Sequence, residues 1–569
     1  MLIAGVNMGR TCDGRHRLKD GAACLLRDGE ILVAIAEERL SRRKHDGGHT
    51  LALDYCLASV GATYSDLDMV AVSTCAEEPL DDGCDLRLPV DRRRIFSVPS
   101  HHLSHAHTAY MLSPFTDAAI MVMDNEGTIV GRRTSEVYWR NRVERNTYYT
   151  GDQGSIERLD TADDGLGTDE LGPGEAYRHF TYYLGWHSYV YAGNTMGLAP
   201  YGDRRRLDGL RVFDLRTDAV RTLLRNGDAD PARAVVGLAA EAGIDIGPPR
   251  LPHEALTPHH ADIAALIQDE LEAAVVHKAR SLQRITGSRN LCVGGGVALN
   301  CVALRRILEQ TDFDHVYTGP TPGDTGQCVG NALYAWTTLA GGARRTNPGK
   351  AFFGRRYSAR EVEATLMNDP RLRVRKPDSL VAEVAGSIAR GYVTGWFQGP
   401  SELGPRALGA RSILADPRPR AMRDYLNLVV KHREPFRPFA PSVLIDHAAP
   451  FFDVPHAGRF MEIIATATPM GRERVPAVIH VDGSARLQAL SGDDTSVFAA
   501  LLREFHRNTG IPMVLNTSFN LSGEPMVETP ADAVDCFLRS DLDLLAIEGF
   551  LVSRSTDPHP GPRFHQRFR

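Results

Sequence analysis

The chain has little lysine and few cysteines. Among its 65 basic residues only positions 19, 44, 278, 350, 376 and 431 are lysine, so almost every cation is an arginine. The nine cysteines are scattered and never form a Cys-x-x-Cys pair, which argues against a disulfide framework or a cysteine zinc site and favours a reducing, cytoplasmic setting. No run of roughly 18 apolar residues occurs and the first residues resemble no signal peptide, so we expect no membrane association.

The charge balance excludes a global basic field. Subtracting the 71 acidic residues from the 65 basic ones gives −6, so we expect no nucleic-acid partner. The hydrophobic share of 43% and the charged share of 24% are typical of globular proteins. A length of 569 residues is several typical domain sizes, which predicts more than one domain.

The N-terminal half predicts a repeated α/β unit. Strands are expected at 2–7, 22–26 and 31–35, with a turn at Asp28 and Gly29. Residues 118–131 repeat the pattern of an apolar strand, a turn with Asn and Gly, and another strand. These two hairpins favour a duplicated α/β domain of the actin-like ATPase type.

Further along the chain, composition marks a lid, a helix and a domain boundary. Residues 137–177 are polar and rich in Gly and Asp, which predicts an excursion over a site rather than core. Apolar spacing predicts an amphipathic helix over 262–285, followed by a strand at 290–293. The composition changes again at 337–354, so we expect domains at 1–348 and 349–569.

Two histidines and two aspartates form a candidate metal site. His101 and His105 are four residues apart, so on a helix they project from one face. Asp124 ends an apolar strand and Asp324 lies in a loop that leads into an apolar helix. This mixed set of ligands suits a divalent iron, manganese or zinc ion; capping or buried structural roles for the histidines are the alternative.

Two further segments suggest anion binding. Gly294, Gly295 and Gly296 follow a predicted strand, as in a turn that lets a nucleotide approach the backbone, although a simple tight turn has the same pattern. Residues 396–444 contain a dense group of cations, namely Arg406, Arg411, Lys431, Arg433 and Arg437, interleaved with Pro and Phe. Buried cations need anions, so this segment predicts a phosphate or acyl-phosphate site.

Taken together, the motifs resemble the O-carbamoyltransferase family of NodU-type and cephalosporin- and aminoglycoside-modifying enzymes, over nearly the whole chain. The matching motifs are AEERLSRRKH (36–45), HHLSHA (101–106), MGLAPYG (196–202), GGGVALNC (294–301), PGDTGQCVGNAL (322–333), GPRALGARSILADP (404–417), KHREPFRPFAPSVL (431–444), GSARLQ (483–488) and NTSFN (516–520). The resemblance implies a threonylcarbamoyl-transferase-like N-terminal domain of the actin-like ATPase superfamily and a YrdC-like C-terminal domain.

The resemblance also implies chemistry and residue roles. Carbamoyl phosphate and ATP would give carbamoyl adenylate, whose carbamoyl group passes to a hydroxyl of a small-molecule acceptor with a metal, favoured as iron(II), in the N-terminal domain. The implied metal ligands are His101, His105, Asp124 and Asp324. Lys44, Asn300 and the turn Gly294–Gly296 would lie at the adenylate, and the donor phosphates would be held by Arg406, Lys431, Arg437, Arg486, Asn516 and Ser518.

Three positions depart from the family pattern. Lys19 stands where the family usually has His, Asn194 lies in the segment that usually carries Gly-Lys, and Pro400 replaces an Arg. We expect Lys19 to contact the acceptor or the adenylate phosphate, because an unperturbed lysine is protonated at neutral pH. The first two departures leave the general base open.

Other readings of the same motifs stay open. The family chemistry could act on tRNA or on a protein, or the chain could be a degenerate scaffold that has lost transfer. The net charge argues against tRNA, and the missing paired cysteines argue against a hydrogenase-maturation enzyme. The identity of the acceptor and the oligomeric state are not encoded in any motif.

Overall fold

The computed structural model describes residues 1–8, 20–74, 88–129, 143–159, 171–224, 230–345, 349–454, 458–556 and 561–567. The chain divides into two units. The first contains Met1–Glu37 and Asp46–Lys350, and the second contains Ala351–Arg569 together with the segment Glu38–His45. The main division between the units thus follows Lys350, close to the boundary after residue 348 that the composition predicts. The segment Glu38–His45, however, belongs to the second unit.

The first unit is built on two five-stranded sheets with the same topology, and it also contains a short antiparallel pair of β9 (Phe213–Asp214) and β10 (Arg221–Thr222). The strand orders are β3-β2-β1-β4-β5 and β8-β7-β6-β11-β12. In each, three consecutive strands pair antiparallel, and the first of them continues through parallel pairs to two later strands. This repeat confirms the predicted duplicated actin-like domain. The strands are β1 (Leu2–Met8), β2 (Ala22–Arg27), β3 (Glu30–Ala36), β4 (Met69–Thr74), β5 (Ile95–Ser97), β6 (Asp117–Met123), β7 (Asn146–Asp152), β8 (Ser155–Arg158), β11 (Asn290–Gly294) and β12 (His315–Tyr317).

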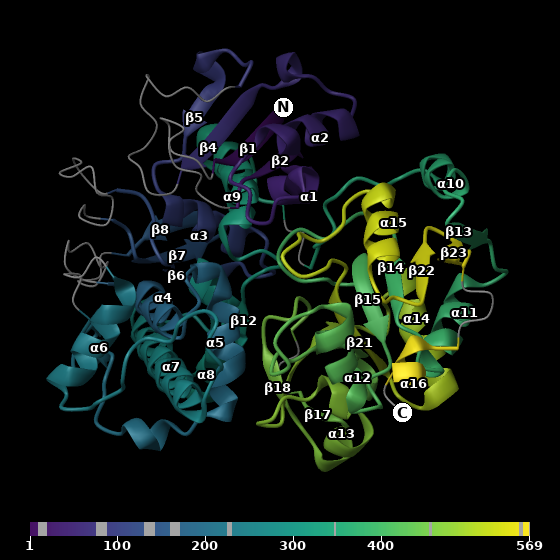
Figure 1. Cartoon of the computed structure of the whole chain (residues 1–569). Helices are drawn as coiled ribbons and strands as arrows, with labels where there is room; N and C mark the ends of the chain where they lie inside the picture. Colours follow the sequence, from purple (N-terminus) through teal and green to yellow (C-terminus); the bar gives the residue numbers. More distant parts are fainter. Residues whose placement is uncertain are drawn as a thin grey trace. The chain divides into compact units, whose positions relative to one another are not determined.

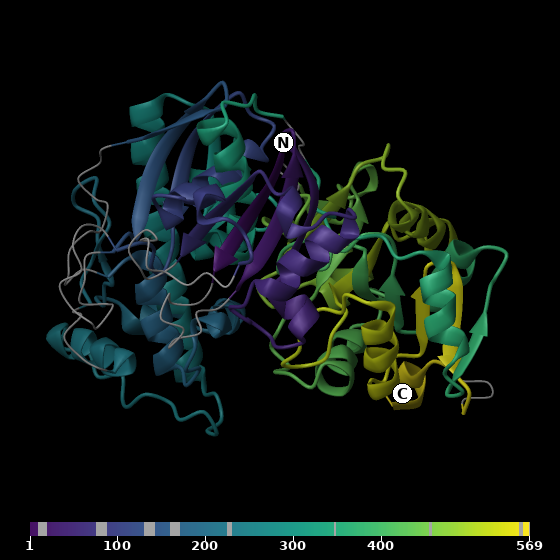
Figure 2. The same ribbon diagram turned by 90° about the horizontal axis from the view of Figure 1, so that it is seen from above.

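The first hairpin forms where its turn residues predict it. Asp28 and Gly29 have φ values of 49° and 85°, and such left-handed angles are what a tight hairpin turn between twisted strands requires. The purple strands of this sheet run side by side in Figure 2. The second hairpin differs from the prediction, because Ile129 makes only an isolated bridge to Val143 and the antiparallel partner of β6 is β7.

The helices of the first unit pack on and between these sheets (Figure 1). Helices α3 (His101–Met111) and α9 (Gln327–Tyr334) pack against each other, and α9 also covers β1. The predicted helix over 262–285 is α7 (Pro258–Thr286), which begins at a capping box of Thr257 and ends at the left-handed Gly287. The others include α2 (Thr50–Ser59), α4 (Pro173–Tyr183), α5 (Ala192–Leu198), α6 (Pro231–Glu241) and α8 (Cys301–Gln310).

The described part of the polar segment 137–177 forms regular secondary structure rather than the excursion that its composition suggests. Within its described part, residues 143–159 supply strands β7 and β8, and α4 begins at Pro173. The side chains of Tyr148 and Tyr149 are buried beside β6. Successive side chains of a strand point to opposite faces of its sheet, so β7, which lies between β6 and β8, is buried on both faces, and composition alone misses this.

The second unit is built on one mixed eight-stranded sheet with helices around it, so it has the α/β fold class that we expect for it. The order is β13-β23-β22-β14-β15-β21-β16-β20. Its core contains Trp396, Phe397 and Phe505. The strands are β13 (Leu372–Arg375), β14 (Thr394–Phe397), β15 (Arg411–Ala415), β16 (Ala440–Leu444), β20 (Gln488–Leu490), β21 (Met513–Ser518), β22 (Leu544–Ile547) and β23 (Phe550–Arg554), with a small sheet of β17 (Phe452–Asp453), β18 (Ile464–Ala467) and β19 (Ser484–Arg486). The helices are α10 (Ala359–Met367), α11 (Leu380–Ala389), α12 (Ala421–Tyr425), α13 (Pro469–Arg474), α14 (Val497–Thr509), α15 (Pro530–Arg539) and α16 (Arg563–Arg567).

None of the helices in the described part of the chain combines the length and the apolar composition needed to cross a bilayer.

Candidate functional site

Helix α3 presents two imidazoles on one face. Ser100 caps the helix by accepting a hydrogen bond from the backbone N–H of Leu103 at 3.1 Å, so the first turn is fixed just where His101 begins. The Nε2 atoms of His101 and His105 lie 3.3 Å apart, and both side chains are buried. The two imidazoles therefore lie on the same face of the helix, as their spacing in the sequence predicts.

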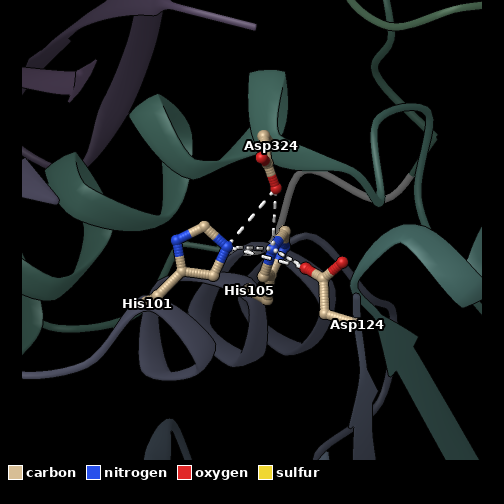
Figure 3. A group of neighbouring side chains, drawn as sticks. All are labelled: His101, His105, Asp124 and Asp324. Carbon is tan, nitrogen blue, oxygen red and sulfur yellow. Dashed lines mark hydrogen bonds and ion pairs between the residues drawn. The ribbon is translucent and has the colours of Figure 1, made fainter. Parts of the chain in front are cut away.

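Two carboxylates from distant segments complete the cluster (Figure 3). Asp124 directly follows β6, and Asp324 begins the turn that leads into α9. The Nε2 of His105 lies 3.0 Å from Asp124 Oδ2 and 3.4 Å from Asp324 Oδ1; the matching distances from His101 are 3.6 and 3.4 Å. The four ligand atoms lie within 4.8 Å of one another, so these side chains could hold one divalent metal ion.

The glycine turn after β11 orients Asp124. Backbone N–H groups of Asn125 and Gly296 donate to Asp124 Oδ1 at 2.7 and 3.1 Å, which leaves Oδ2 toward the histidines. Gly295 has a φ of 87°, and a Cβ there would lie 2.3 Å from the carbonyl oxygen of Met123. The turn must therefore be glycine so that the backbone can reach this aspartate.

Gln327 is a residue of this site that the sequence reading missed. Its Nε2 lies 2.6 Å from Nε2 of His101 and 3.0 Å from Nε2 of His105, and its Oε1 accepts a hydrogen bond from Ser73. Gln327 follows Asp324 by three residues at the start of α9. The three-residue spacing from Asp324 is the one sequence feature that could indicate Gln327 as a site residue. Glutamine is common in helices, so this spacing alone does not predict a functional role.

Metal binding should strengthen as the pH rises. Burial by itself lowers the pKa of His101, but Asp324 and Asp124 outweigh burial and raise this pKa to about 10; the same carboxylates raise the pKa of His105. Ligation requires neutral imidazole, so binding displaces protons, and the association constant should rise about tenfold per pH unit for each proton displaced. Chelator-competition titrations with Mn²⁺ from about pH 6 to about pH 8 measure this slope. Affinity that does not change with pH would contradict the histidine ligands.

A second cluster lies in the second unit at one edge of the sheet, by which we mean the side where β16 and β20 begin and β21 ends. Strands β16 and β20 are parallel, with Ser442 opposite Gln488, so the residues just before each strand lie at the same edge. Arg437 precedes β16 and Arg486 precedes β20. Antiparallel β21 brings Asn516 opposite Ala440 and ends at Ser518, at this edge too. We call Arg433, Arg437 and Arg486 the arginine cluster.

Two predicted ligand residues of this edge have protein partners of their own. The ammonium of Lys431 donates to the carbonyl oxygen of Ser518 and to the carbonyl and Oδ1 of Asn520, the last two at 2.9 and 2.7 Å. The amide nitrogen of Asn516 contacts oxygens of Ala407, Ser442 and Gln488 at 3.1, 2.9 and 3.2 Å. Both side chains therefore fix the edge of the sheet.

The segment Glu38–His45 brings Lys44 to the second unit. Arg39 donates to the carbonyl oxygen of Gly404 at 3.1 Å, and Arg42 donates to those of Pro525 and Met526 at 3.0 and 2.7 Å. Burial is the main cause that lowers the pKa of Lys431, followed by the charge of Arg433, and the charge of Lys44 adds a smaller contribution. Lys44 therefore belongs to the same unit as Lys431.

The remaining predicted residues are distributed as follows. Asn300 caps α8 through its Oδ1 and bonds Gln268 through its amide nitrogen, so it holds the end of the glycine turn. Asn194 is buried in α5, and Arg406 lies in the loop before β15. Lys19 lies outside the described residues.

The fold and these two clusters define an α/β protein with a candidate metal centre in one unit and a cationic edge in the other. Two family models match the chain: Carbamoyltransferase N-terminus over residues 80–333 and Carbamoyltransferase C-terminus over residues 385–554. The chain therefore belongs to the carbamoyltransferase family, and it is a carbamoyltransferase enzyme.

The chain is similar to two further proteins over 95% of its length. Nodulation protein NolNO of Sinorhizobium fredii is 33% identical, over 95% of this chain and 79% of its own length. The uncharacterized protein sll1178 of Synechocystis is 31% identical, over 95% of this chain and 96% of its own. Among solved structures, full-length HypF aligns over 60% of this chain and 56% of its own, with 14% identity and a TM-score of 0.34. The topology of the two sheets, rather than this likeness, carries the fold assignment.

Proposed function

We propose that the protein is an ATP-dependent O-carbamoyltransferase that takes carbamoyl phosphate as donor and transfers the carbamoyl group to a hydroxyl of a small-molecule natural product in the cytoplasm. The observation that carries the proposal is the presence of two chemically different clusters in one chain of this family. The buried histidines and aspartates suit a divalent metal. The arginine cluster suits phosphates.

The arginine cluster would serve the activation step. Carbamoyl phosphate, ATP and one water balance to carbamoyl adenylate, pyrophosphate and inorganic phosphate. All of these species are strongly anionic, and charge builds on phosphate oxygens as the bond to pyrophosphate breaks. Arg437 and Arg486, with Arg406 from the neighbouring loop, would neutralise that charge, while Lys431 holds the loop from Ser518 to Asn520 beside them.

The first unit would serve the transfer step. The acceptor oxygen attacks the carbamoyl carbon, AMP leaves, and the hydroxyl proton passes to a base. His101, His105, Asp124 and Asp324 would hold a divalent metal, favoured as iron(II) with manganese and zinc as alternatives, which supplies Lewis-acid polarisation when bound. The glycine turn keeps Asp124 in its ligating orientation through the N–H of Gly296.

The proposed function is tested by measuring pyrophosphate release and the mass of candidate acceptors in the same reaction. The purified protein is incubated with ATP, Mg²⁺, a divalent transition metal and hydroxylated small molecules, with and without carbamoyl phosphate. We expect pyrophosphate release that depends on carbamoyl phosphate, and a mass gain in an acceptor equal to one carbamoyl group replacing one hydrogen. Release that ignores carbamoyl phosphate would refute the donor, and carbamoylation of only tRNA or a protein would refute the acceptor class.

A further inference from the structure

Arg433 lies in the loop that joins the turn Leu426–Val430 to β16, two residues after Lys431. His432 has a φ of 47°, a left-handed angle that turns the backbone between the two cations. The backbone N–H of Arg433 donates to the carbonyl oxygen of Asn427 at 2.9 Å, and its Nε donates to Asn427 Oδ1 at 2.8 Å. Its guanidinium carbon lies 4.5 Å from the ring centre of Phe439. One edge and one face of this guanidinium are therefore fixed.

The other edge of Arg433 has no partner in the described part of the chain. Nη1 and Nη2 form no hydrogen bond there, and no carboxylate is close enough for an ion pair. Other arginines of this unit behave differently: Arg418 pairs with Asp416 at 2.7 Å, and Arg539 pairs with Glu524 at 2.7 Å. Arg433 thus keeps two parallel donors available in a preorganised plane.

The surroundings of Arg433 are strongly cationic. Burial and then the charge of Arg437 lower the pKa of Arg433 to about 9; Glu434 opposes this shift, and Arg486 adds a smaller lowering effect. Glu434 lies 3.7 Å from Arg437 and is the only acid that forms an ion pair with any of the three arginines in the described part of the chain. Three guanidinium groups held together in this way are costly without an anion, and a phosphate with several oxygens offsets that cost.

The neighbouring lysine faces elsewhere. Lys431 uses its ammonium on the loop from Ser518 to Asn520, so it ties two strand ends together. In the segment from residue 431 to residue 437, Arg433 and Arg437 are the two arginines whose guanidinium groups can donate to a ligand. We propose that Arg433 is a ligand-binding residue of the arginine cluster, and that its terminal nitrogens grip a phosphate group of a donor substrate beside Arg437 and Arg486. This inference rests on the proposed function.

The test compares Arg433→Gln with Arg433→Lys in the full chain. Calorimetric titrations with ATP alone and with carbamoyl phosphate alone show which of the two phosphates Arg433 holds. We expect Arg433→Gln to weaken binding of one of them about 30-fold or more, the usual scale for losing one charge-assisted bidentate contact. Arg433→Lys should recover part of that affinity, because it keeps the charge but not the paired donors.

The matched control is Arg507→Gln, which removes an arginine of the same unit that pairs with Glu504 and whose side chain is 73% exposed. A ligand-binding role of Arg433 predicts a much smaller loss of affinity in this control variant. If Arg507→Gln weakens binding as much as Arg433→Gln, the loss is not specific to Arg433 and the inference is wrong. It is equally wrong if Arg433→Gln leaves both affinities within about twofold, a change of ~0.4 kcal/mol. A wild-type chain that binds neither ligand would refute the proposed function itself, and with it this inference.

Discussion

Replacing His105 with alanine is expected to strip the bound divalent metal from the protein. The Nε2 of this imidazole lies within 3.4 Å of an oxygen of each carboxylate, and its ring is buried. Loss of residues that only support metal ligands commonly costs 10- to 100-fold in affinity, so loss of a ligand itself should cost about 100-fold or more. Elemental analysis after dialysis and a competition titration with Mn²⁺ measure the effect.

The matched control for this change is His107→Ala in the same helix. The His107 ring is buried like that of His105, but its Nδ1 contacts the carbonyl oxygen of Leu103 at 2.9 Å and its ring packs on Tyr334. His107→Ala should therefore lower stability without lowering the metal content per folded protein. Full metal occupancy in both His101→Ala and His105→Ala would show that the cluster is not the metal centre.

The quartet of His101, His105, Asp124 and Asp324 was accessible to sequence reasoning because each member has a local signal. Residues four apart on a helix share a face, and a carboxylate just after a buried strand lies at a sheet edge whatever the rest of the fold. The duplicated topology was accessible for the same reason, since the turn at Asp28 and Gly29 and the apolar strands around it act locally. Whether the quartet binds metal stays a prediction.

The features that were missed depend on contacts between distant segments. Nothing local tells that Lys431 points to Asn520, that Gln327 reaches the imidazoles, or that Arg39 lies on the loop at Gly404. The same holds for Tyr148, whose burial comes from its neighbour strand and not from its polar surroundings. A cation in a motif therefore predicts an anion nearby, but the fold decides whether that anion is a ligand or a backbone oxygen.

The second large effect concerns the division of the reaction between the two units. Arg437→Ala is expected to slow carbamoyl-phosphate-dependent pyrophosphate release about 30-fold or more, because a charge-assisted contact to phosphate is worth about 2 to 5 kcal/mol. Burial is the main cause that lowers the pKa of Arg437; Glu434 opposes this shift and Arg486 adds to it. His105→Ala should keep much of the release and lose carbamoyl transfer to the acceptor.

Arg507→Ala supplies the matched control. Like Arg437, Arg507 forms an ion pair with a glutamate three residues earlier, Glu504, but the side chain of Arg507 is 73% exposed. This variant should release pyrophosphate within about twofold of the wild type, because an exposed pair contributes little. Arg437→Ala, His105→Ala and Arg507→Ala are each assayed for pyrophosphate and for carbamoylated acceptor in the same reaction. The two half-reactions are thereby measured separately. The division between the units is wrong if His105→Ala abolishes pyrophosphate release as completely as Arg437→Ala does, since one site would then serve both steps.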